Sequence, residues 1–198
     1  MMDAVASGRE NQKRRTRRHL LDAAARLLAQ GKTITLEDVA TEALVSRARV
    51  YRYFTSPEQL MSEAALDLAA PQAETLFAKD ASTDPVARLE KADEALDAMV
   101  YSNEAALRAF MIVALQRKLN GEQVQVRQNR RTPLIEAALA PARKEFKPAQ
   151  LAMLRKAMAL VLGTESMLAF KDVLGLDEAE TRRVKRWMIR ALVDAARK

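Results

Sequence analysis

Apolar residues recur at helical spacing along most of the chain. Leu20, Ala24, Leu27 and Leu28, for example, fall on one face of a helix expected over 13–30. No alternation of apolar and polar residues is long enough to predict a strand. Residues that favour helices, such as Ala, Leu, Arg, Glu and Met, abound, whereas β-branched and aromatic residues are sparse. We therefore expect an all-α protein.

Glycine and proline separate the periodic segments and set the expected helix ends. The expected helices, about nine, span 13–30, 36–43, 47–53, a segment from 57, 85–101, 103–119, 122–146, 148–173 and 178–197. Gly31 should end the first helix, and Pro71 should end or kink the helix that starts at 57. Pro133 and Pro141 should divide the segment 122–146. Residues 1–12 are expected to form a disordered arm.

Three helix-start signals lie close together between positions 35 and 57. Thr35, with an acid three residues later, has the pattern of a capping box. Ser46 is an N-cap candidate flanked by two valines at hydrophobic-staple positions. Ser56 precedes Pro57, which suits the first position of a helix. The pattern predicts two short helices around a tight turn, braced by a third helix.

The second short helix should expose a dense set of basic and aromatic side chains. Val50 and Phe54 should point inward at i and i+4. The side chains that must then point outward or sideways are Arg47, Ala48, Arg49, Tyr51 and Arg52. Arginine can bind guanine in the major groove of DNA, alanine can meet a thymine methyl group, and tyrosine can bind phosphate. The candidate DNA contacts are Arg14, Arg17, Thr35, Ser46, Arg47, Ala48, Arg49, Tyr51, Arg52 and Tyr53. The alternative is a surface helix that merely happens to be basic.

Positive charge is concentrated around this predicted helix-turn-helix. Residues 13–52 hold ten Lys and Arg against four Asp and Glu, whereas residues 61–198 hold 22 against 19. The formal net charge of the chain is +7. A basic head on a nearly balanced body favours a polyanion such as double-stranded DNA as partner, although a solvated charged surface has the same composition.

Residues 14–60 resemble the DNA-binding domain of TetR-type regulators. The resemblance rests on Ile-Thr-Leu-Glu-Asp-Val-Ala at 34–40, Ser-Arg-Ala-Arg-Val-Tyr-Arg-Tyr-Phe at 46–54 and Ser-Pro-Glu-Gln-Leu at 56–60. It implies a three-helix DNA-binding domain at 13–60 and an all-α ligand-binding and dimerisation domain at 61–198. It also implies a homodimeric repressor that a small-molecule effector releases from a near-palindromic operator.

Two positions depart from the family pattern. Leu44 stands in the turn where the family usually has glycine, so this residue must either accept a left-handed backbone or change the turn. Pro57 stands where the family usually has a lysine that touches phosphate, and proline cannot supply that contact. The basic run 13–18 is expected to compensate, although it could also be a solvated helix start.

The resemblance implies that the last two long helices form the dimer contact. Their apolar seams contain the candidate interface residues Leu151, Leu154, Val161, Leu168, Val184, Trp187, Ala191 and Ala195. The sequence alone would equally allow these helices to form only intrachain core. Arg182, Arg183, Lys185, Arg186 and Arg190 are expected around the other faces of the last helix.

A ligand pocket, if present, is expected between the middle helices. Its candidate lining is Met99, Leu107, Phe110, Met111, Leu115, Leu134, Met158 and Glu165. Glu165 lies in a nearly all-apolar run, where an unpaired carboxylate is costly. Glu165 therefore either binds a cationic or hydrogen-bond-donating ligand or pairs with an arginine such as Arg108 or Arg131.

The sequence argues against catalysis and against a membrane location. There is no cysteine, no Gly-rich phosphate loop, no H-E-x-x-H and no G-x-S-x-G, and the single histidine, His19, has no clustered carboxylates around it. Catalytic residues, cofactors and metal ligands are therefore not expected, and an all-helical enzyme is the least favoured alternative. The other alternative is a DNA-binding regulator controlled by a protein partner. With no long apolar run and no signal-peptide pattern, we expect a cytoplasmic protein.

Overall fold

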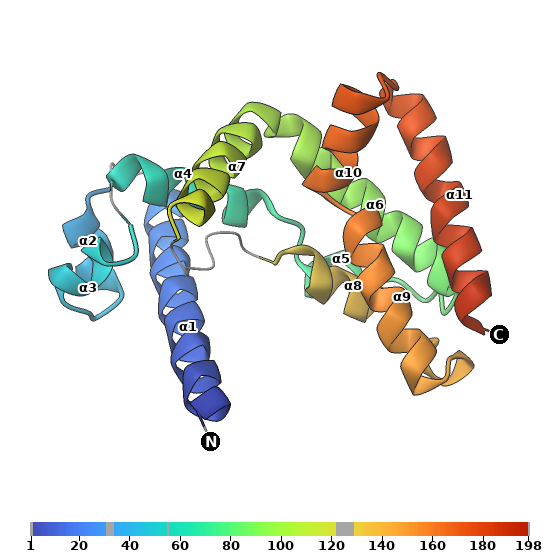
Figure 1. The fold of residues 1–198 in the computed structure, drawn as a ribbon, viewed down its shortest axis with the longest axis horizontal. Coiled ribbons are helices and arrows are strands. Elements are labelled where there is room, and N and C mark those ends of the chain that lie inside the picture. The colour runs from blue at the N-terminus through green and yellow to red at the C-terminus, as the bar shows by residue number, and fades with distance from the viewer. Residues whose placement is uncertain (1, 31–33, 55, 122–128, 198) are drawn as a thin grey trace. The chain divides into compact units, whose positions relative to one another are not determined.

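The computed structural model describes residues 2–30, 34–54, 56–121 and 129–197, without the side chains of residues 2–11 and of Arg14. These ranges contain helices and connecting turns and no strand, which confirms the all-α prediction (Figure 1). The α-helices are α1 (Met2–Ala29), α2 (Leu36–Glu42), α3 (Arg47–Tyr51), α4 (Pro57–Ala69), α5 (Ala73–Leu76), α6 (Pro85–Ser102), α7 (Glu104–Leu119), α8 (Arg131–Leu139), α9 (Pro148–Val161), α10 (Thr164–Leu168) and α11 (Glu178–Arg197). A 3-10 turn, η1 (Arg143–Glu145), follows α8, and a π-helical turn, η2 (Ala169–Val173), follows α10.

The chain divides into two compact units. The first unit comprises Met1–Ala69 and Arg108–Arg127, and the second comprises Ala70–Leu107 and Gln128–Lys198. Helix α4 belongs to the first unit because Leu60 and Ala64 are part of the same apolar core as α1, α2 and α3. The first unit therefore continues nine residues past position 60, where we expected the DNA-binding domain to end.

In the first unit, α1 and α4 lie side by side, and α2 packs against both α1 and α3 (Figure 1). The prediction of a disordered arm at residues 1–12 is wrong for residues 2–12, because α1 begins at Met2 and these residues extend the helix. Adding a turn to an existing helix costs much less than nucleating a new one, so weak helix formers can be included. Helix α4 ends before Pro71, as expected, and the prediction for Gly31 lies outside the described residues.

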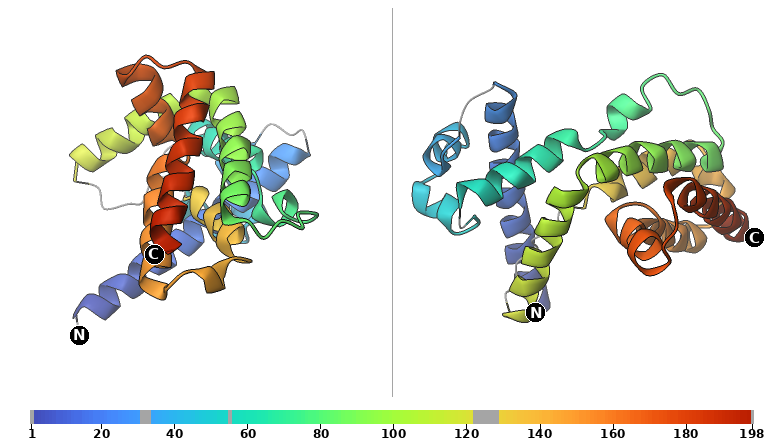
Figure 2. Two further views of the ribbon diagram at one scale, coloured as in Figure 1. Left: turned by 90° about the vertical axis from the view of Figure 1, so that its right-hand side faces the viewer. Right: turned by 90° about the horizontal axis from the view of Figure 1, so that it is seen from above.

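In the second unit, α11 packs against both α6 and α9, which Figure 2 shows from two sides. Its core includes Leu89 of α6, Leu134 of α8, Met158 of α9 and Ile189 of α11, all fully buried. An ion pair of 2.8 Å between Arg197 and Glu145 joins the end of α11 to η1, the turn just before α9, so α9 and α11 run antiparallel.

The helix expected over 148–173 is interrupted after α9. Gly163 has φ of 106°, a backbone conformation that other residues rarely adopt. A Cβ atom at this position would also lie 3.4 Å from the guanidinium carbon of Arg131. Arg131 donates a 2.5 Å hydrogen bond to the carbonyl oxygen of Ala159, which satisfies part of the broken helix end. The segment expected over 122–146 forms only α8 and η1 within the described residues, with Pro141 just after α8.

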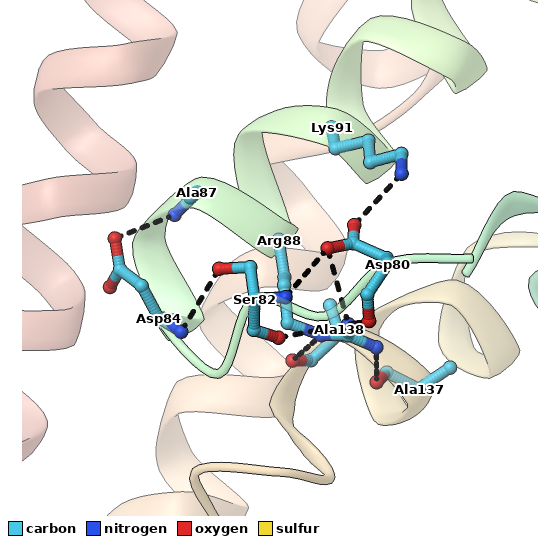
Figure 3. Close-up of polar contacts among 8 residues, drawn as sticks. All are labelled: Asp80, Ser82, Asp84, Ala87, Arg88, Lys91, Ala137 and Ala138. Carbon is cyan, nitrogen blue, oxygen red and sulfur yellow. Dashed lines mark hydrogen bonds and ion pairs between the residues drawn. The ribbon is translucent and has the colours of Figure 1, made fainter. Parts of the chain in front are cut away.

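A buried arginine joins the start of α6 to the end of α8. The guanidinium of Arg88 donates to the carbonyl oxygens of Ala138 and Ala137, at 3.0 Å each, and of Ser82 at 3.2 Å (Figure 3). It also lies 4.2 Å from the centre of the Phe77 ring. Its acceptors come from the last turn of α8 and from the loop before α6. Arg88 therefore holds three separate segments of the second unit together.

Candidate nucleic-acid interface

Helix α2 is fixed at its first residue by the predicted capping box. Thr35 Oγ1 accepts a 3.1 Å hydrogen bond from the backbone N–H of Asp38, and the Asp38 carboxylate accepts one of 2.9 Å from the backbone N–H of Thr35. Leu36, Val39 and Ala40 then point into the core of the first unit. The reciprocal cap defines where α2 starts, and the buried stripe defines which side of α2 is left exposed.

The turn between α2 and α3 contains a strained residue. Leu44 has φ of 53°, so it occupies the left-handed region that glycine usually fills. Its side chain is 92% exposed. Of the two alternatives for this position, the structure adopts the left-handed backbone and keeps the turn. A non-glycine residue there costs about 1–2 kcal/mol relative to an unstrained backbone.

His19 supports the same turn from α1, a role that the sequence did not reveal. Its Nε2 atom lies 3.0 Å from the carbonyl oxygen of Ala43, at the end of α2. A protonated Nε2 donates to that carbonyl, which would otherwise be one of the unpaired acceptors of a helix end. Because the two residues are 24 positions apart, local spacing gave no signal of this contact.

Helix α3 presents its polar side chains to solvent. Val50 is fully buried, and Arg47, Arg49 and Arg52 are exposed, with Tyr51 at 51% exposure. Among the other candidate contacts, Thr35, Ser46 and Ala48 are also exposed. Ser46 has the extended backbone of an N-cap residue, but its side chain forms no capping hydrogen bond. The N-cap hydroxyl of α4, Ser56 Oγ, does accept from the backbone N–H of Gln59 at 3.2 Å.

The three exposed arginines of this segment differ in their surroundings. The guanidinium of Arg47 forms an ion pair with Glu37 of α2, and both side chains are at the surface. Arg52 lies over the ring of Tyr53, with 5.6 Å between the guanidinium carbon and the ring centre. In the part of the chain that the structure describes, Arg49 has no acidic partner. Arg49 therefore carries a positive charge that is available to a polyanion.

Arg17 is buried, which corrects its assignment as a DNA contact. Only 3% of this residue is exposed, because its guanidinium pairs with Glu63 of α4 and lies 4.8 Å from the centre of the Phe54 ring. Arg17 thus joins α1, α4 and the end of the α3 segment. The sequence could not reveal this role, because Glu63 lies 46 residues away and looks like an ordinary surface acid.

Tyr53 also differs from its expected position. It is 7% exposed and belongs to the core of the first unit, so the bulk of its ring contributes to packing. Tyr51 is the more accessible of the two tyrosines. Lys13 and Arg15 of the basic run are exposed, whereas the side chain of Arg14 lies outside the described residues.

The predicted ligand-binding residues are mostly buried. In the second unit, Met99, Leu107, Leu134 and Met158 are between 0% and 7% exposed and form part of its core. Phe110, Met111 and Leu115 lie on the part of α7 that groups with the first unit, where Phe110 is buried, Met111 is half-buried and Leu115 is 58% exposed. The ligand-binding role of these residues remains a prediction.

Glu165 has the arginine partner that one of the two alternatives required. Arg131 donates a 2.6 Å hydrogen bond to the Glu165 carboxylate, and the two side chains are 18% and 30% exposed. The same guanidinium binds the carbonyl oxygen of Ala159. The carboxylate thus helps to hold the start of α10 beside the end of α9, and a ligand contact remains a prediction.

The predicted dimer residues fall on two different kinds of surface. Leu151, Leu154 and Val161 are 5%, 2% and 3% exposed, so this seam of α9 packs inside the chain and is not a free surface. Leu168 and Val184 are half-buried. Trp187 is 71% exposed, and Ala191 and Ala195 are exposed on the same side of α11. Two residues of α9 that were not predicted, Met153 and Leu160, are 70% and 68% exposed.

Lys185 corrects the expected arrangement of α11. It was expected among the outward-facing basic residues, yet it is 1% exposed and faces α6. Its Nζ atom lies 2.6 Å from Asp93 and 2.7 Å from Asp97, two carboxylates one helical turn apart. Burial, with the neighbouring negative charge of Asp97, raises the pKa of Asp93 to about 7 even though Lys185 opposes the shift.

Two further features of the described residues are relevant to function. No group of three or more His, Asp or Glu side chains lies close enough together to hold a metal ion. No single helix there is long and apolar enough to cross a membrane, and only α6 and α7, taken together across an 85° bend, meet that criterion by length and composition.

The comparisons with known proteins agree with the geometry of the first unit. Residues 20–64 match the family model described as bacterial regulatory proteins, tetR family. Comparison with curated proteins and with solved structures finds no match. The matched segment contains the capped α2, the strained turn, the exposed α3 and the start of α4. Residues 20–64 therefore form a DNA-binding domain of the tetR family of bacterial regulatory proteins, and the chain is a DNA-binding regulator of transcription.

Proposed function

We propose that this protein is a homodimeric repressor that a small molecule releases from a near-palindromic operator. The observation that carries the DNA-reading part is the exposure of Arg49 on α3, without an acidic partner among the described residues. Arg47 and Arg52 flank it on the same short segment. Arginine on a helix in the major groove can donate two hydrogen bonds to guanine O6 and N7.

An exposed apolar face in the second unit supports a homodimer. Met153 and Leu160 lie seven residues apart on α9 and therefore share one side of that helix. Trp187 is exposed on the neighbouring antiparallel α11. Large side chains at 68–71% exposure are costly in water, and a second copy of the same face would cover them. We assign this corrected set, in place of Leu151, Leu154 and Val161, to the dimer contact.

Release by a small molecule rests on the family resemblance and on the methionine-rich core of the second unit. Met99, Met158 and Met167 are each at most 7% exposed, and methionine side chains can adapt to an apolar guest. The other candidate, a regulator controlled by a protein partner, would use an exposed surface instead. A protein that reads bacterial DNA works in the cytoplasm, which is where we propose that this regulator acts.

Selection of duplexes from a random pool tests the DNA-reading part. We expect one enriched near-palindrome whose half-sites are about one DNA turn (~34–36 Å) apart, with an affinity that falls steeply as salt rises. Arg49→Ala should reduce discrimination between this operator and its single-base variants, at a cost of about 1–3 kcal/mol. Lys13→Ala with Arg15→Ala is the matched control, because loss of phosphate contacts lowers affinity evenly for all sequences. Selection that enriches no sequence would contradict the proposal.

Sedimentation and ligand screening test the other two parts. The wild-type protein should sediment as a dimer at micromolar concentration, and Trp187→Glu should convert it to a monomer while its helix content stays constant. A thermal-shift screen of small molecules, followed by a DNA-release assay, should find a compound that dissociates the operator complex. A monomeric wild-type protein would contradict the dimer. A broad screen without a hit would favour control by a protein partner.

A further inference from the structure

The reading surface of the first unit contains one carboxylate beside its arginines. Glu37 lies in the first turn of α2, and its carboxylate accepts a hydrogen bond from Arg47 Nη2 at the start of α3. The Glu37 and Arg47 side chains are 40% and 68% exposed. A negative charge at this place repels the phosphates of the DNA that the surface binds, so its presence needs an explanation.

Stability does not explain the pair well. An ion pair between exposed side chains contributes little to folding, because water screens the charges and two long side chains lose freedom. The neighbouring acid, Asp38, already caps α2 through the backbone N–H and hydroxyl of Thr35. Glu37 has no part in that capping box. The remaining structural role is a general interaction with the positive end of α2, which would not require Arg47.

The geometry instead suggests an effect on Arg47. A free arginine side chain at the edge of a reading helix can bind phosphate or base, and phosphate carries no sequence information. A carboxylate that holds one edge of the planar guanidinium leaves the other N–H donors directed away from it. It also lowers the attraction of the pair for phosphate, since the two charges cancel.

We propose that Glu37 is a specificity-determining residue that positions Arg47 to read a guanine in the major groove. Arg47 then differs from Arg49, whose charge is not cancelled by a carboxylate within the described residues. This inference rests on the proposed DNA reading by α3, and it assigns Arg47 to base recognition through Glu37. Arg47 without Glu37 should bind the DNA backbone and discriminate poorly.

Substitution of Glu37 by glutamine tests this inference, because glutamine keeps the shape of the side chain and removes its charge. The experiment measures dissociation constants of the full-length protein for the selected operator, for its single-base variants and for a scrambled duplex. We expect E37Q to lower the ratio of operator to scrambled affinity about ten-fold, with the loss confined to one base pair of each half-site. R47A should relax the same base pair, and E37Q combined with R47A should relax it no further.

Glu42 provides the matched control. It lies on the same helix, its carboxylate pairs with Arg26 of α1 at 2.8 Å, and E42Q removes the same charge. E42Q should change affinity for operator and scrambled DNA by the same factor, so their ratio stays constant. Thermal melting of both variants should match the wild type, because both carboxylates are at the surface.

The outcomes separate this inference from the proposed function. If E37Q raises affinity for every duplex evenly, as E42Q does, Glu37 is only a repulsive charge and the inference is wrong. If E37Q keeps every wild-type base preference, the inference is also wrong. In both cases the operator and the Arg49 effect would remain. A wild-type protein that prefers no sequence would overturn the proposed function and the role of Glu37 together.

Discussion

Each of the two units buries one arginine within the described residues, and the hydrogen-bond partners of the two differ in kind, although Arg88 also has the Asp80 carboxylate 3.8 Å away. Arg88 in the second unit donates to backbone carbonyls of the α8 end and the preceding loop and stacks on Phe77. Arg17 in the first unit stacks on Phe54 and pairs with the carboxylate of Glu63, while its Nε and Nη1 atoms have no hydrogen-bond partner among the residues that the structure describes. A substitution can remove the Glu63 carboxylate, because it belongs to a side chain. No substitution removes the backbone carbonyls that accept from Arg88.

This difference teaches what each arginine contributes. Because the acceptors of Arg88 are backbone groups, its loss leaves several buried carbonyls without donors. Arg17 carries unsatisfied donors, so its burial is costly and a well-packed apolar pair could replace it. Arg88 therefore stabilises the second unit, whereas the Arg17–Glu63 pair chiefly sets how α1, α4 and the α3 segment meet.

The largest effect is expected for Arg88→Met, which should lower the free energy of unfolding by about 3–5 kcal/mol. Methionine keeps much of the side-chain volume but donates no hydrogen bond to Ala137, Ala138 or Ser82. Urea unfolding followed by circular dichroism measures the change. Lys91→Met in the same cluster is the control, because Lys91 is 42% exposed and its pair with Asp80 should contribute less than about 1 kcal/mol. Equal effects of the two substitutions would refute the assignment.

The next effect concerns the buried ion pair between Arg17 and Glu63. Arg17→Met alone should lower the free energy of unfolding by about 3 kcal/mol, because it removes the Arg17 cation from the fully buried Glu63 carboxylate. Adding Glu63→Leu should restore stability to within about 1 kcal/mol of the wild type. A double-mutant cycle by urea unfolding checks this. Additive losses in the cycle would show that Arg17 stabilises the unit in the same way as Arg88.

A smaller effect concerns pH and the carboxylates around Lys185. Since the pKa of Asp93 is raised to about 7 in the folded protein, the folded state holds this proton more tightly than the unfolded state. The contribution to stability is therefore largest in acid and is lost as pH rises from about 4 through 7. The melting temperature should fall over that range, and Asp93→Asn should flatten the profile. Glu94→Gln, on the exposed side of α6, should keep most of the wild-type slope, because the Glu94 charge is the smallest of the causes that raise the pKa of Asp93. A wild-type melting temperature that rises from pH 5 to 7, with the rise abolished by Asp93→Asn, would contradict this prediction.

The smallest effect concerns the strained turn of the first unit. Leu44→Gly should raise the free energy of unfolding by about 0.5 kcal/mol, because the relief of left-handed strain exceeds the added freedom of glycine in the unfolded chain. Leu44→Ala removes the same exposed side chain but keeps the strain, so it should not stabilise. Thermal melting of the two variants makes the comparison. Equal stabilities would mean that the turn is not strained.

Local sequence was sufficient for the helix-turn-helix. The capping box at Thr35, the buried Val50 and the start of α4 at Pro57 all depend on residues within four positions of one another. The departure at Leu44 was visible too, but the sequence left open whether the residue is left-handed or the turn changes, and the structure shows the left-handed backbone. For these features the physical cause is local, and a pattern of neighbours is enough to predict it.

Long-range contacts could not be predicted in the same way. Arg17 was assigned to DNA and Lys185 to the surface, and each instead contacts a residue at least 46 positions away. The contact of His19 with Ala43, 24 positions away, had no local signal either. Charge and spacing along the chain do not show which of these polar side chains will meet a buried partner. The exposed fraction of each residue depends on which helix packs against it, and that helix can be far away in the sequence.

Helix periodicity and caps are properties of short segments, so the sequence predicted an all-helical protein with a DNA-binding helix-turn-helix near its N-terminus. The face of each helix that is covered depends instead on the packing of helices far apart in the sequence. On α11, Thr181, Lys185, Ile189 and Val193 face inward, while Trp187 and Ala191 remain exposed. Both faces have helical spacing and each contains apolar side chains. The carboxylates of Asp93 and Asp97 on α6 selected the inward one, because a buried lysine is stable only where opposite charge meets it.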